Sequence, residues 1–492
     1  MRGEAVHAAA GPERRIGRRP LLLGAGGLAG AAVLTAASGW AGPDREGPAG
    51  WVGTSGGTSG GSQQPPATAL AATLRAVCAR LASAGLAPPQ VARVAAVLGV
   101  AAHEALPSEG RRPLLPRLGL AVPARPAGRP DQASVLAATT ATVLDGMLPT
   151  PPGGVPGWVR AASGGGPTAG DGPWERRARA VAASLVAWAG SDGASRAAAP
   201  TWRPPVGPAC WVPTPPGFAP ALLPGWGLVR PYALRGPDDV REAPPVPFST
   251  ADGSAFRQQA LEVRDALARR LGPDGDEARV IATFWDDGVG TASPGGHWLL
   301  VLADLIEQRR LELDVALAAF ARLGMALHDA FVACWAGKYR HCLLRPVTYL
   351  RRYVDPGWGS LLLTPNFPEH PSGHADVSHA AATVLAAVLG EGPFTSTVPL
   401  VARPVTGGDA PSLAISSGPI SSTPISSGPM SSVTDGSGPA PARRRDFGSL
   451  SSAADEAGWS RLYGGIHYPR SIQAGARQGR LVGERVLAAF PL

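Results

Sequence analysis

The sequence contains almost no lysine. Lys338 is the only lysine among 45 basic residues, and every other one is an arginine. Together with the excess of alanine and glycine, this looks like coding bias. The net charge of +8 therefore indicates only a general attraction for anions. No run of basic residues carries interleaved aromatic residues, so we do not expect the protein to bind nucleic acid.

Cysteine is also scarce, with four residues in 492. Cys78, Cys210, Cys334 and Cys342 show neither the CxxC spacing of a metal site nor a dense disulfide framework. Cys334 and Cys342 lie eight residues apart on one predicted helix and are not expected to pair. A Cys78–Cys210 bridge stays open, but buried free thiols are the favoured interpretation.

Long hydrophobic runs are absent after residue 41, where no segment holds eighteen consecutive apolar residues. Residues 1–41 have paired arginines, then an apolar run and small residues, which is the layout of an export signal. Arg18 and Arg19 before Pro-Leu-Leu fit the twin-arginine type, and an uncleaved membrane anchor is the alternative. We therefore expect an extracellular, periplasmic or cell-envelope protein whose mature chain is not inserted in a membrane.

Residues 42–66 are rich in Gly, Ser and Pro and predict a linker. From residue 67 onward apolar residues recur at three- and four-residue spacing, whereas alternating strand patterns are rare. Gly (64) and Pro (52) are abundant, so long irregular connections should separate the helices. The sequence predicts an all-α helical domain over 67–492, with helices in the segments 68–86, 91–106, 132–148, 175–190, 254–271, 297–308, 313–341 and 374–389.

Residues 404–445 differ from the rest of this domain. They include ISSGPISSTPISSGPMSSV, a five-residue repeat that starts at Ile415. Serine, glycine and proline at this density cannot form a packed core. We predict a disordered insertion between helical parts of the same domain.

KYRHCLLRP, residues 338–346, holds the single lysine. Lys338 and Arg345 are seven residues apart, which is two turns if one helix continues as far as Pro346. Two cations on one side of an apolar helix are costly unless an anion meets them. A simple interaction of both cations with the helix dipole is the alternative.

Two further elements add candidate ligands for an anion. In PSGHAD, Ser372 is a natural N-cap, and the backbone N–H groups of Ser372 and Gly373 would face outward at a helix N-terminus. His374 lies in the first turn of that helix, where it can act as acid or base. In SRLYGGIHYPR, a Gly-Gly turn can bring Arg461 and His467 to one point.

The candidate residues of the three elements share one kind of chemistry, because all of them can donate hydrogen bonds to an anion. The cations Lys338, Arg345 and Arg461 and the neutral donors of Ser372 and Gly373 would bind a compact oxyanion through charge-assisted hydrogen bonds. The group itself contains no carboxylate, which disfavours a divalent-metal site.

The three elements together resemble the signature of the type-2 phosphatidic acid phosphatase and vanadium haloperoxidase superfamily. That signature is Lys, six residues, Arg-Pro, then PSGH, then Ser-Arg, five residues, His, and all three parts match in order. The segments CWAGK, TPNFPEHPSGH and CWVPTPPGFAPALLPGWG resemble the vanadium-dependent haloperoxidase branch. The resemblance covers residues 67–492 and implies the helical-bundle fold of that superfamily.

The resemblance also implies a role for each residue. His467 would bind vanadium directly, and the oxygens of vanadate would be held by Lys338, Arg345, Ser372, Gly373 and Arg461. His374 would hydrogen-bond an oxygen and move protons, and Lys338 would polarise bound hydrogen peroxide. The implied partners are hydrogen peroxide, a halide (chloride or bromide) and an organic substrate halogenated by a hypohalous-acid equivalent. A homodimer is also implied.

Two aromatic residues and one departure refine this expectation. Trp335 and Phe367 resemble the aromatic wall at the halide pocket of chloride-oxidising members, with ordinary core packing as the alternative. His370 stands where tyrosine is often found in the family. The alternative function is a secreted acid phosphatase, in which His467 would form a phospho-histidine and His374 would protonate the leaving group.

Overall fold

The computed structural model describes residues 67–148, 171–197, 202–268, 275–288, 290–399 and 442–492. The predicted signal and linker, residues 1–66, lie outside the described residues. Among those described, helices dominate and the only sheet is a two-stranded ribbon, which confirms the all-α prediction. The stretch 202–250 is irregular apart from short 3-10 turns at Trp226–Leu228 and Pro237–Val240, as expected from its proline content.

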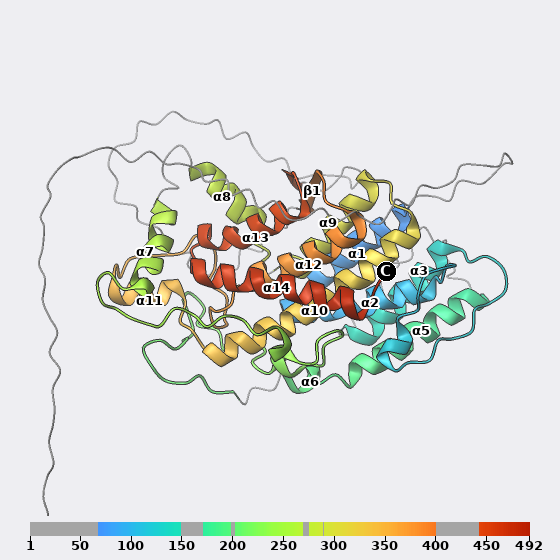
Figure 1. Ribbon diagram of the computed structural model, residues 1–492, viewed down its shortest axis with the longest axis horizontal. Helices are drawn as coiled ribbons and strands as arrows, with labels where there is room; N and C mark the ends of the chain where they lie inside the picture. Colours follow the sequence, from blue (N-terminus) through green and yellow to red (C-terminus); the bar gives the residue numbers. More distant parts are fainter. Residues whose placement is uncertain (1–66, 149–170, 198–201, 269–274, 289, 400–441) are drawn as a thin grey trace, which may run out of the picture. The chain divides into compact units, whose positions relative to one another are not determined.

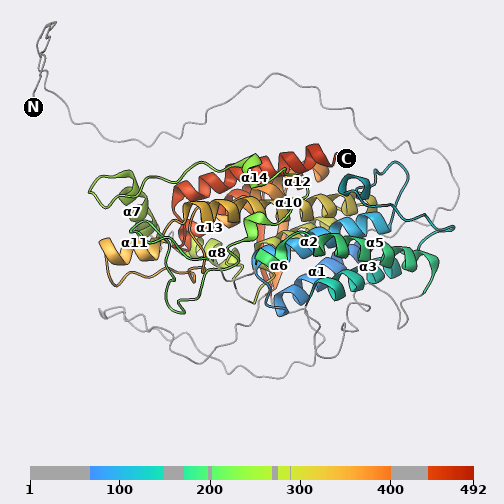
Figure 2. The same cartoon turned by 90° about the horizontal axis from the view of Figure 1, so that it is seen from below.

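The helices pack in two groups that meet along α10 (Leu313–His341). One group is formed by α1 (Thr68–Ser83), α2 (Pro88–Ala105), α3 (Gln132–Met147), α5 (Pro173–Gly190) and α9 (Ser293–Gln308). The other is formed by α12 (Gly373–Leu389), α13 (Leu450–Tyr463) and α14 (Pro469–Ala489). Figures 1 and 2 show α10 between α2 and the pair α12–α14. Shorter helices complete the domain: α6 (Ala194–Ala197), α7 (Ala255–Ala268), α8 (Gly275–Phe284) and α11 (Pro346–Tyr353).

Glycines let these helices approach closely. A Cβ on Gly99 of α2 would come within 2.8 Å of the Phe320 carbonyl oxygen of α10, and one on Gly324 would come within 2.6 Å of the Ala95 carbonyl oxygen. On α14, a Cβ on Gly475 would lie 2.4 Å from the carbonyl oxygen of Ser372. These contacts are too short for any side chain. They press α14 onto the start of α12, where the predicted anion-binding turn lies.

Helix α10 is long and apolar enough to cross a bilayer, but 89% of its most apolar window is buried inside the protein. It therefore serves as the central core helix, with Phe320, Phe331 and Trp335 among its fully buried side chains. All four cysteines are free, and three of them are buried. The predicted free thiols are thus confirmed, and the open Cys78–Cys210 bridge does not form.

The helix at residues 338–346 ends earlier than predicted. α10 stops at His341 because Cys342 adopts a left-handed conformation (φ 48°), and Leu343 then forms a bridge with Cys210. Pro346 begins the new helix α11 instead of ending the old one, which suits a residue with fixed φ and no N–H. Lys338 and Arg345 therefore do not lie on one continuous helix.

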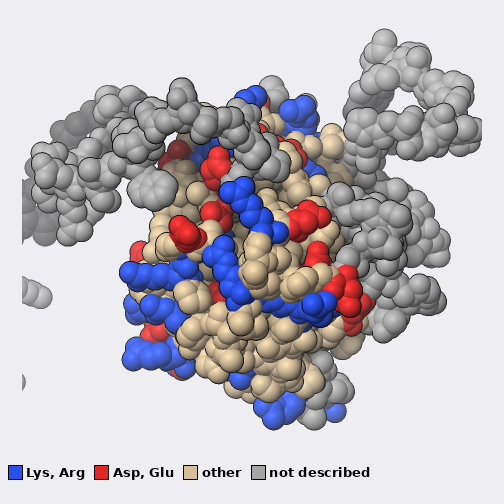
Figure 3. Space-filling model, turned by 90° about the vertical axis from the view of Figure 1, so that its right-hand side faces the viewer, with Lys and Arg blue, Asp and Glu red and all other residues tan. Residues whose placement is uncertain are grey.

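The end of the predicted insertion also needs correction. Residues 400–441 lie outside the described residues, but 442–445 belong to β2 (Ala442–Phe447), which pairs antiparallel with β1 (Phe394–Pro399). Arg445 forms ion pairs with Glu277 and Glu456, which fix this strand against the helices. On the end of the molecule seen in Figure 3, basic and acidic side chains are interspersed, so the net positive charge forms no continuous patch there.

Candidate active site

The predicted site residues come together where the ends of five helices meet. Lys338 lies in the last turn of α10, and Arg345 directly precedes α11. Ser372 is the N-cap of α12, Arg461 lies in the last turn of α13, and His467 lies two residues before α14. Lys338, Arg345 and Arg461 each act on the pKa of His467 as nearby charges, so the three motifs converge in space as predicted.

Lys338 is completely buried, and backbone carbonyl groups surround its ammonium group. Nζ donates to the carbonyl oxygens of Pro368 (3.2 Å), Glu369 (3.1 Å) and Pro371 (2.5 Å). Burial lowers the pKa of Lys338 to about 8. Because an ammonium has three hydrogens, an anion would have to share or displace one of these carbonyl partners.

Arg345 and Arg461 each keep a guanidinium nitrogen that has no hydrogen-bond partner in the part of the chain that the structure describes. Arg345 donates from Nε to the Phe367 carbonyl oxygen (2.9 Å) and from Nη1 to that of Ile466 (2.8 Å). Arg345 Nη2 and Arg461 Nε are buried without a hydrogen-bond partner among the described residues. Burial lowers the pKa of both guanidinium groups to about 10, so both stay charged at neutral pH.

His467 is held from both sides of its ring. Nδ1 lies 2.7 Å from Glu369 Oε1, and Nε2 lies 3.1 Å from Arg345 Nη1. Burial and the charges of Arg345 and Lys338 lower the pKa of His467 well below its ordinary value, so the ring is neutral. A neutral ring can offer a lone pair to an electrophile or a metal.

The start of α12 differs in detail from the prediction. The backbone N–H of Ser372 does not face an open site, because it donates to the Ser471 carbonyl oxygen at 3.0 Å. The hydroxyl Oγ of Ser372 is buried and has no partner among the described residues. A Cβ added to Gly373 would lie 3.9 Å from Lys338 Cε and 3.9 Å from Trp335 Cζ3. Glycine therefore leaves space beside the lysine that an alanine would fill.

His374 has a carboxylate partner. Its Nε2 lies 3.3 Å from Asp287 Oδ2, and Oδ1 of the same carboxylate lies 2.9 Å from His297 Nδ1. Burial lowers the pKa of His374 to about 4. Although burial alone would raise it, the two histidines bring the pKa of Asp287 below its ordinary value. Burial and the charge of Arg461 therefore keep His374 neutral, whereas the Asp287 carboxylate beside Nε2 can orient the ring.

Carboxylates were not among the predicted site residues. Glu369 precedes the PSGH segment by two residues, and Asp376 follows His374 by two, so both were visible within the motif region. Asp287 comes from a loop 87 residues away from His374 and gave no local signal beyond a pair of aspartates before a glycine. The part of the chain that the structure describes holds no group of three or more His, Cys, Asp or Glu side chains that could bind a metal ion.

Trp335 and Phe367 form an aromatic wall beside the cations. Their ring centroids are 4.9 Å apart. Lys338 Nζ lies 5.1 Å and Arg345 Cζ 4.9 Å from the Phe367 centroid, within the range of cation–π attraction. Trp335 is fully buried and donates from Nε1 to the Leu222 carbonyl oxygen, whereas Phe367 is partly exposed. The two predicted halide-pocket residues thus lie together next to Lys338.

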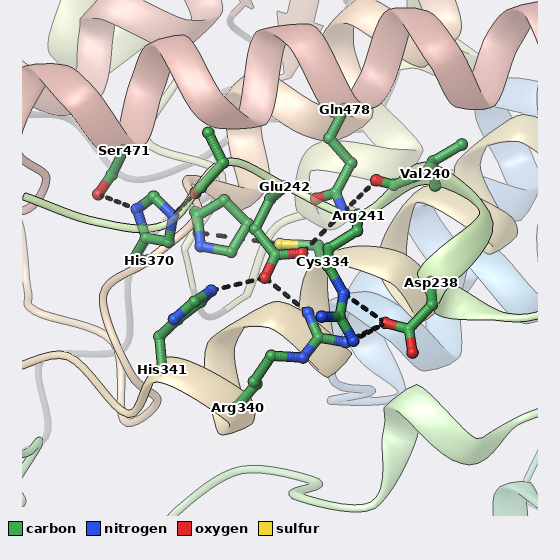
Figure 4. A network of polar contacts seen from close by, with 12 residues as sticks. Asp238, Val240, Arg241, Glu242, Cys334, Arg340, His341, His370, Ser471 and Gln478 are labelled. Carbon is green, nitrogen blue, oxygen red and sulfur yellow. Dashed lines mark hydrogen bonds and ion pairs between the residues drawn. The ribbon is translucent and has the colours of Figure 1, made fainter.

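A second polar network lies behind the site (Figure 4). Glu242 accepts hydrogen bonds from Arg340 and lies 2.7 Å from His341 Nε2, just after Lys338 in the chain. These contacts lower the pKa of Glu242 to about 2, although burial alone would raise it. His341 packs edge-to-face on His370, with ring centroids 5.2 Å apart. This network fixes the end of α10 on which Lys338 is placed.

The geometry as a whole suits a compact oxyanion. Three buried cations converge, and among the described residues Arg345, Arg461 and Ser372 each keep a buried donor without a hydrogen-bond partner. Unpaired buried donors are costly unless an acceptor meets them.

Comparisons with known proteins agree with this geometry. Residues 318–490 match a family model described as the VCPO second helical-bundle domain. A bacterial vanadium-dependent iodoperoxidase superposes with a TM-score of 0.67 at 25% identity, over 87% of this chain and 98% of its own. Apo and holo bacterial vanadium-dependent chloroperoxidases share the fold at 15% identity, with TM-scores of 0.61 and 0.58. They cover 82% of this chain in each case, and 95% and 93% of their own chains.

No curated protein sequence matches the chain at a significant level. The matched segment 318–490 nevertheless contains all three sequence motifs together with Trp335 and Phe367. The resemblance to the vanadium-dependent haloperoxidases that the motifs predicted is therefore confirmed, both by the family model over this segment and by the shared fold of the described domain.

Proposed function

We propose that the protein is a vanadium-dependent haloperoxidase. It would use hydrogen peroxide to oxidise halide to a hypohalous-acid equivalent that halogenates organic substrates. The observation that carries the proposal is the set of buried, unpaired donors, Arg345 Nη2, Arg461 Nε and Ser372 Oγ, which come from the three separate motifs. An oxyanion with several oxygens would satisfy all of them at once.

Vanadate fits this donor set. Arg345, Arg461 and Ser372 would hold its oxygens together with the backbone of Gly373 and the ammonium group of Lys338. His467 Nε2 would supply the nitrogen ligand, because its lone pair is free of hydrogen when Nδ1–H donates to Glu369. Bound vanadate would supply the Lewis-acidic centre at which peroxide is activated.

His374 would handle protons in the reaction. With its pKa lowered to about 4, the ring is neutral near pH 7 and can accept a proton from hydrogen peroxide as it enters. Asp287 would stabilise the imidazolium that forms, because its carboxylate lies 3.3 Å from Nε2. The buried setting of both groups strengthens their interaction.

Halide would reach the site along the Trp335–Phe367 wall. The positive charges of Lys338 and Arg345 beside Phe367 would attract the anion there. Chloride and bromide are the expected substrates, and the match to an iodoperoxidase makes iodide the third halide to compare.

The setting of the enzyme belongs to the same proposal. We expect export by the twin-arginine-type signal in residues 1–41 and a cell-envelope or extracellular location. A mature chain that is not inserted in a membrane, and a homodimer, complete it. The burial of α10 inside the domain supports only the part of this setting that concerns the membrane, since 89% of its most apolar window is covered by protein.

The test is halogenation of a chromogenic 1,3-diketone by the purified protein, measured before and after addition of orthovanadate. We expect vanadate-dependent turnover with hydrogen peroxide and at least one halide, abolished in His467→Ala. Arg470→Ala is the matched control, because this exposed arginine lies three residues away and makes no contact with the site.

The same preparations distinguish the alternative function. An acid phosphatase would hydrolyse an aryl phosphate, would be inhibited by vanadate, and would show no halogenation with chloride, bromide or iodide. That combination would contradict the haloperoxidase proposal.

A further inference from the structure

Four buried side chains form a continuous chain of polar contacts that ends at His467. His467 Nδ1 lies 2.7 Å from Glu369 Oε1, and Glu369 Oε2 lies 2.5 Å from Ser471 Oγ. Ser471 Oγ lies 2.9 Å from His370 Nδ1, and His370 Nε2 lies 2.7 Å from the Ala243 carbonyl oxygen. Figure 4 marks the contact between Ser471 and His370 with a dashed line. Each of the four side chains is at most 3% exposed. Water therefore cannot replace the partners in this chain.

The groups at the two ends fix which atoms carry hydrogens. The Ala243 carbonyl oxygen can only accept, so His370 Nε2 must carry a hydrogen. The Arg345 guanidinium can only donate, so His467 Nε2 must be the accepting nitrogen. A neutral His467 ring then carries its hydrogen on Nδ1, which donates to Glu369.

The contacts between Glu369, Ser471 and His370 require one hydrogen in addition to that of the Ser471 hydroxyl. Two contacts separate His370 Nδ1 from Glu369 Oε2, and the Ser471 hydroxyl supplies one hydrogen for them. The second hydrogen lies either on Glu369 Oε2 or on His370 Nδ1, and in both cases Glu369 Oε1 is left as an acceptor. Oε1 receives the backbone N–H of Tyr468 at 2.9 Å as well as Nδ1–H of His467. Both proton arrangements therefore hold His467 in the same tautomer.

We infer that Glu369, supported by Ser471 and His370, is a positioning residue that holds His467 in the Nδ1–H tautomer. The Nε2 lone pair, which accepts from Arg345 Nη1 in this structure, is thereby kept available for a ligand that displaces this contact. The inference rests on the proposed function in one respect, because vanadate is the ligand that would use this lone pair. The tautomer itself is a property of the protein without its cofactor.

The contacts of His370 give this residue a structural role in place of the tyrosine often found at its position in the family. His370 replaces the tyrosine expected before PSGH, and its two ring nitrogens bridge Ser471 and the Ala243 carbonyl oxygen. Ser471 and His370 hold the second oxygen of Glu369, so the carboxyl group cannot rotate away from His467. Partners behind a ligating histidine fix its ring orientation and its basicity.

Two substitutions of Glu369 separate positioning from packing. In Glu369→Gln, the amide oxygen can still accept from His467 Nδ1–H, and the amide N–H can donate to Ser471. In Glu369→Leu, the side chain has similar volume but no acceptor. Glu277→Leu is the control, because the Glu277 side chain is exposed and forms its ion pair with Arg445.

The first measurement is the tautomer of His467 in protein free of vanadate. Histidine is labelled with 15N, and the His467 signals are identified by their loss in His467→Gln. We expect the unprotonated nitrogen to be Nε2, recognised by its coupling to both carbon-bound ring protons, in the wild type and in Glu369→Gln. In Glu369→Leu the buried Nδ1–H loses its acceptor, whereas Arg345 Nη1 still donates to Nε2, so we expect the hydrogen to be distributed over both nitrogens. A wild-type ring with its hydrogen on Nε2 would overturn the inference.

The second measurement is orthovanadate affinity by calorimetry. Loss of a supporting partner typically weakens ligation ~10–100-fold, which is the expected effect of Glu369→Leu, whereas Glu369→Gln should stay within ~3-fold of the wild type. Equal affinities in the two variants would also overturn the inference. If Glu369→Leu does not fold, Ser471→Ala takes its place, with an expected weakening of ~3–10-fold for a partner one step further from the ring.

The two proposals can fail independently. Suppose that the wild type shows the Nδ1–H tautomer and that Glu369→Leu shows hydrogen on both nitrogens. This result would support the positioning role of Glu369 even if the protein neither binds vanadate nor halogenates. Conversely, the protein could show vanadate-dependent halogenation while the His467 tautomer is the same in Glu369→Leu and the wild type. That result would support the proposed function and contradict the positioning role of Glu369.

Discussion

Arg322 and Arg345 are both buried arginines, and each contacts residues far away in the chain, but their guanidinium groups are satisfied differently. Arg322 donates from all three nitrogens to backbone carbonyl groups, those of Phe490, Ala318 and Pro491. Arg345 donates from two nitrogens and keeps Nη2 buried without a partner among the described residues. The difference separates a structural arginine, which closes the C-terminus of α14 onto α10, from one that is prepared for a ligand.

The difference between the two arginines matters because an unpaired buried donor costs free energy. A buried donor left without an acceptor costs ~1–3 kcal/mol, so a folded protein keeps one only where something else is gained. Near Arg345 the gain would be the binding of an anion. Near Arg322 no such cost exists, and the three hydrogen bonds serve stability alone.

The largest expected effect is on orthovanadate affinity, which should respond differently to substitution of Arg345 and of Arg322. Arg345→Met should weaken orthovanadate binding by ~10–100-fold, because a charge-assisted hydrogen bond contributes ~1.5–3 kcal/mol. Arg322→Met should leave that affinity within ~3-fold of the wild type. Calorimetric titration of both variants measures the difference, and equal losses of affinity would contradict the contrast.

The free energy of unfolding in urea should respond mainly to substitution of Arg322. Arg322→Met should lower the free energy of unfolding by ~3 kcal/mol, since three carbonyl groups lose their donor. Arg485→Met is the control: Arg485 is half exposed, and its ion pair with Asp239 contributes ~1 kcal/mol at most. Orthovanadate should raise the melting temperature of Arg322→Met but have little effect on Arg345→Met.

A smaller effect concerns pH. The pKa of Lys338 is lowered to about 8 by burial, so its charge is lost as the pH rises through that value. We expect sulfate, whose own charge is constant from pH 7 to 9.5, to bind up to ~10-fold more weakly at the upper end, with the midpoint shifted upward by the bound anion. The affinity of Lys338→Met should be lower and nearly flat over this range. A wild-type profile as flat as that of the variant would show that Lys338 does not face the anion.

The same titration has a consequence for stability. Between pH 8 and 10.5 the unfolded chain holds more protons on this lysine than the folded protein does. The contribution of Lys338 to the free energy of unfolding of the anion-free protein therefore rises with pH across this window. The difference in unfolding free energy between the wild type and Lys338→Met measures it.

The smallest effect is expected at the aromatic wall. Phe367→Leu removes a ring that lies about equally far from Lys338 Nζ and Arg345 Cζ, and such cation–π contacts contribute ~0.5–2 kcal/mol. We expect a shift of ~3–10-fold in the ratio of chloride to bromide turnover, with orthovanadate affinity less affected. Phe248→Leu is the control, since that ring packs in a separate cluster with Phe256 and Tyr349. An unchanged halide ratio would assign Phe367 to core packing.

The sequence by itself determined eight of the helices and much of the chemistry of the site, whereas the helices α13 and α14 on either side of His467 were not predicted. Apolar spacing is a local property, so the predicted helical segments are found in the structure, and the ordered motifs carried the cations Lys338, Arg345 and Arg461 in readable form. It also indicated that PSGH starts a helix, although the Ser372 hydroxyl makes no capping hydrogen bond there.

Tertiary packing decided what these residues contact. The partners of the two histidines, Glu369 and Asp287, could not be assigned beforehand, because 98 and 87 residues separate them from His467 and His374. The break of α10 at Cys342 depends on the bridge between Leu343 and Cys210, which lies 133 residues away. Periodicity and N-cap preferences act over a few residues, whereas hydrogen-bond partners are chosen by how the helices pack.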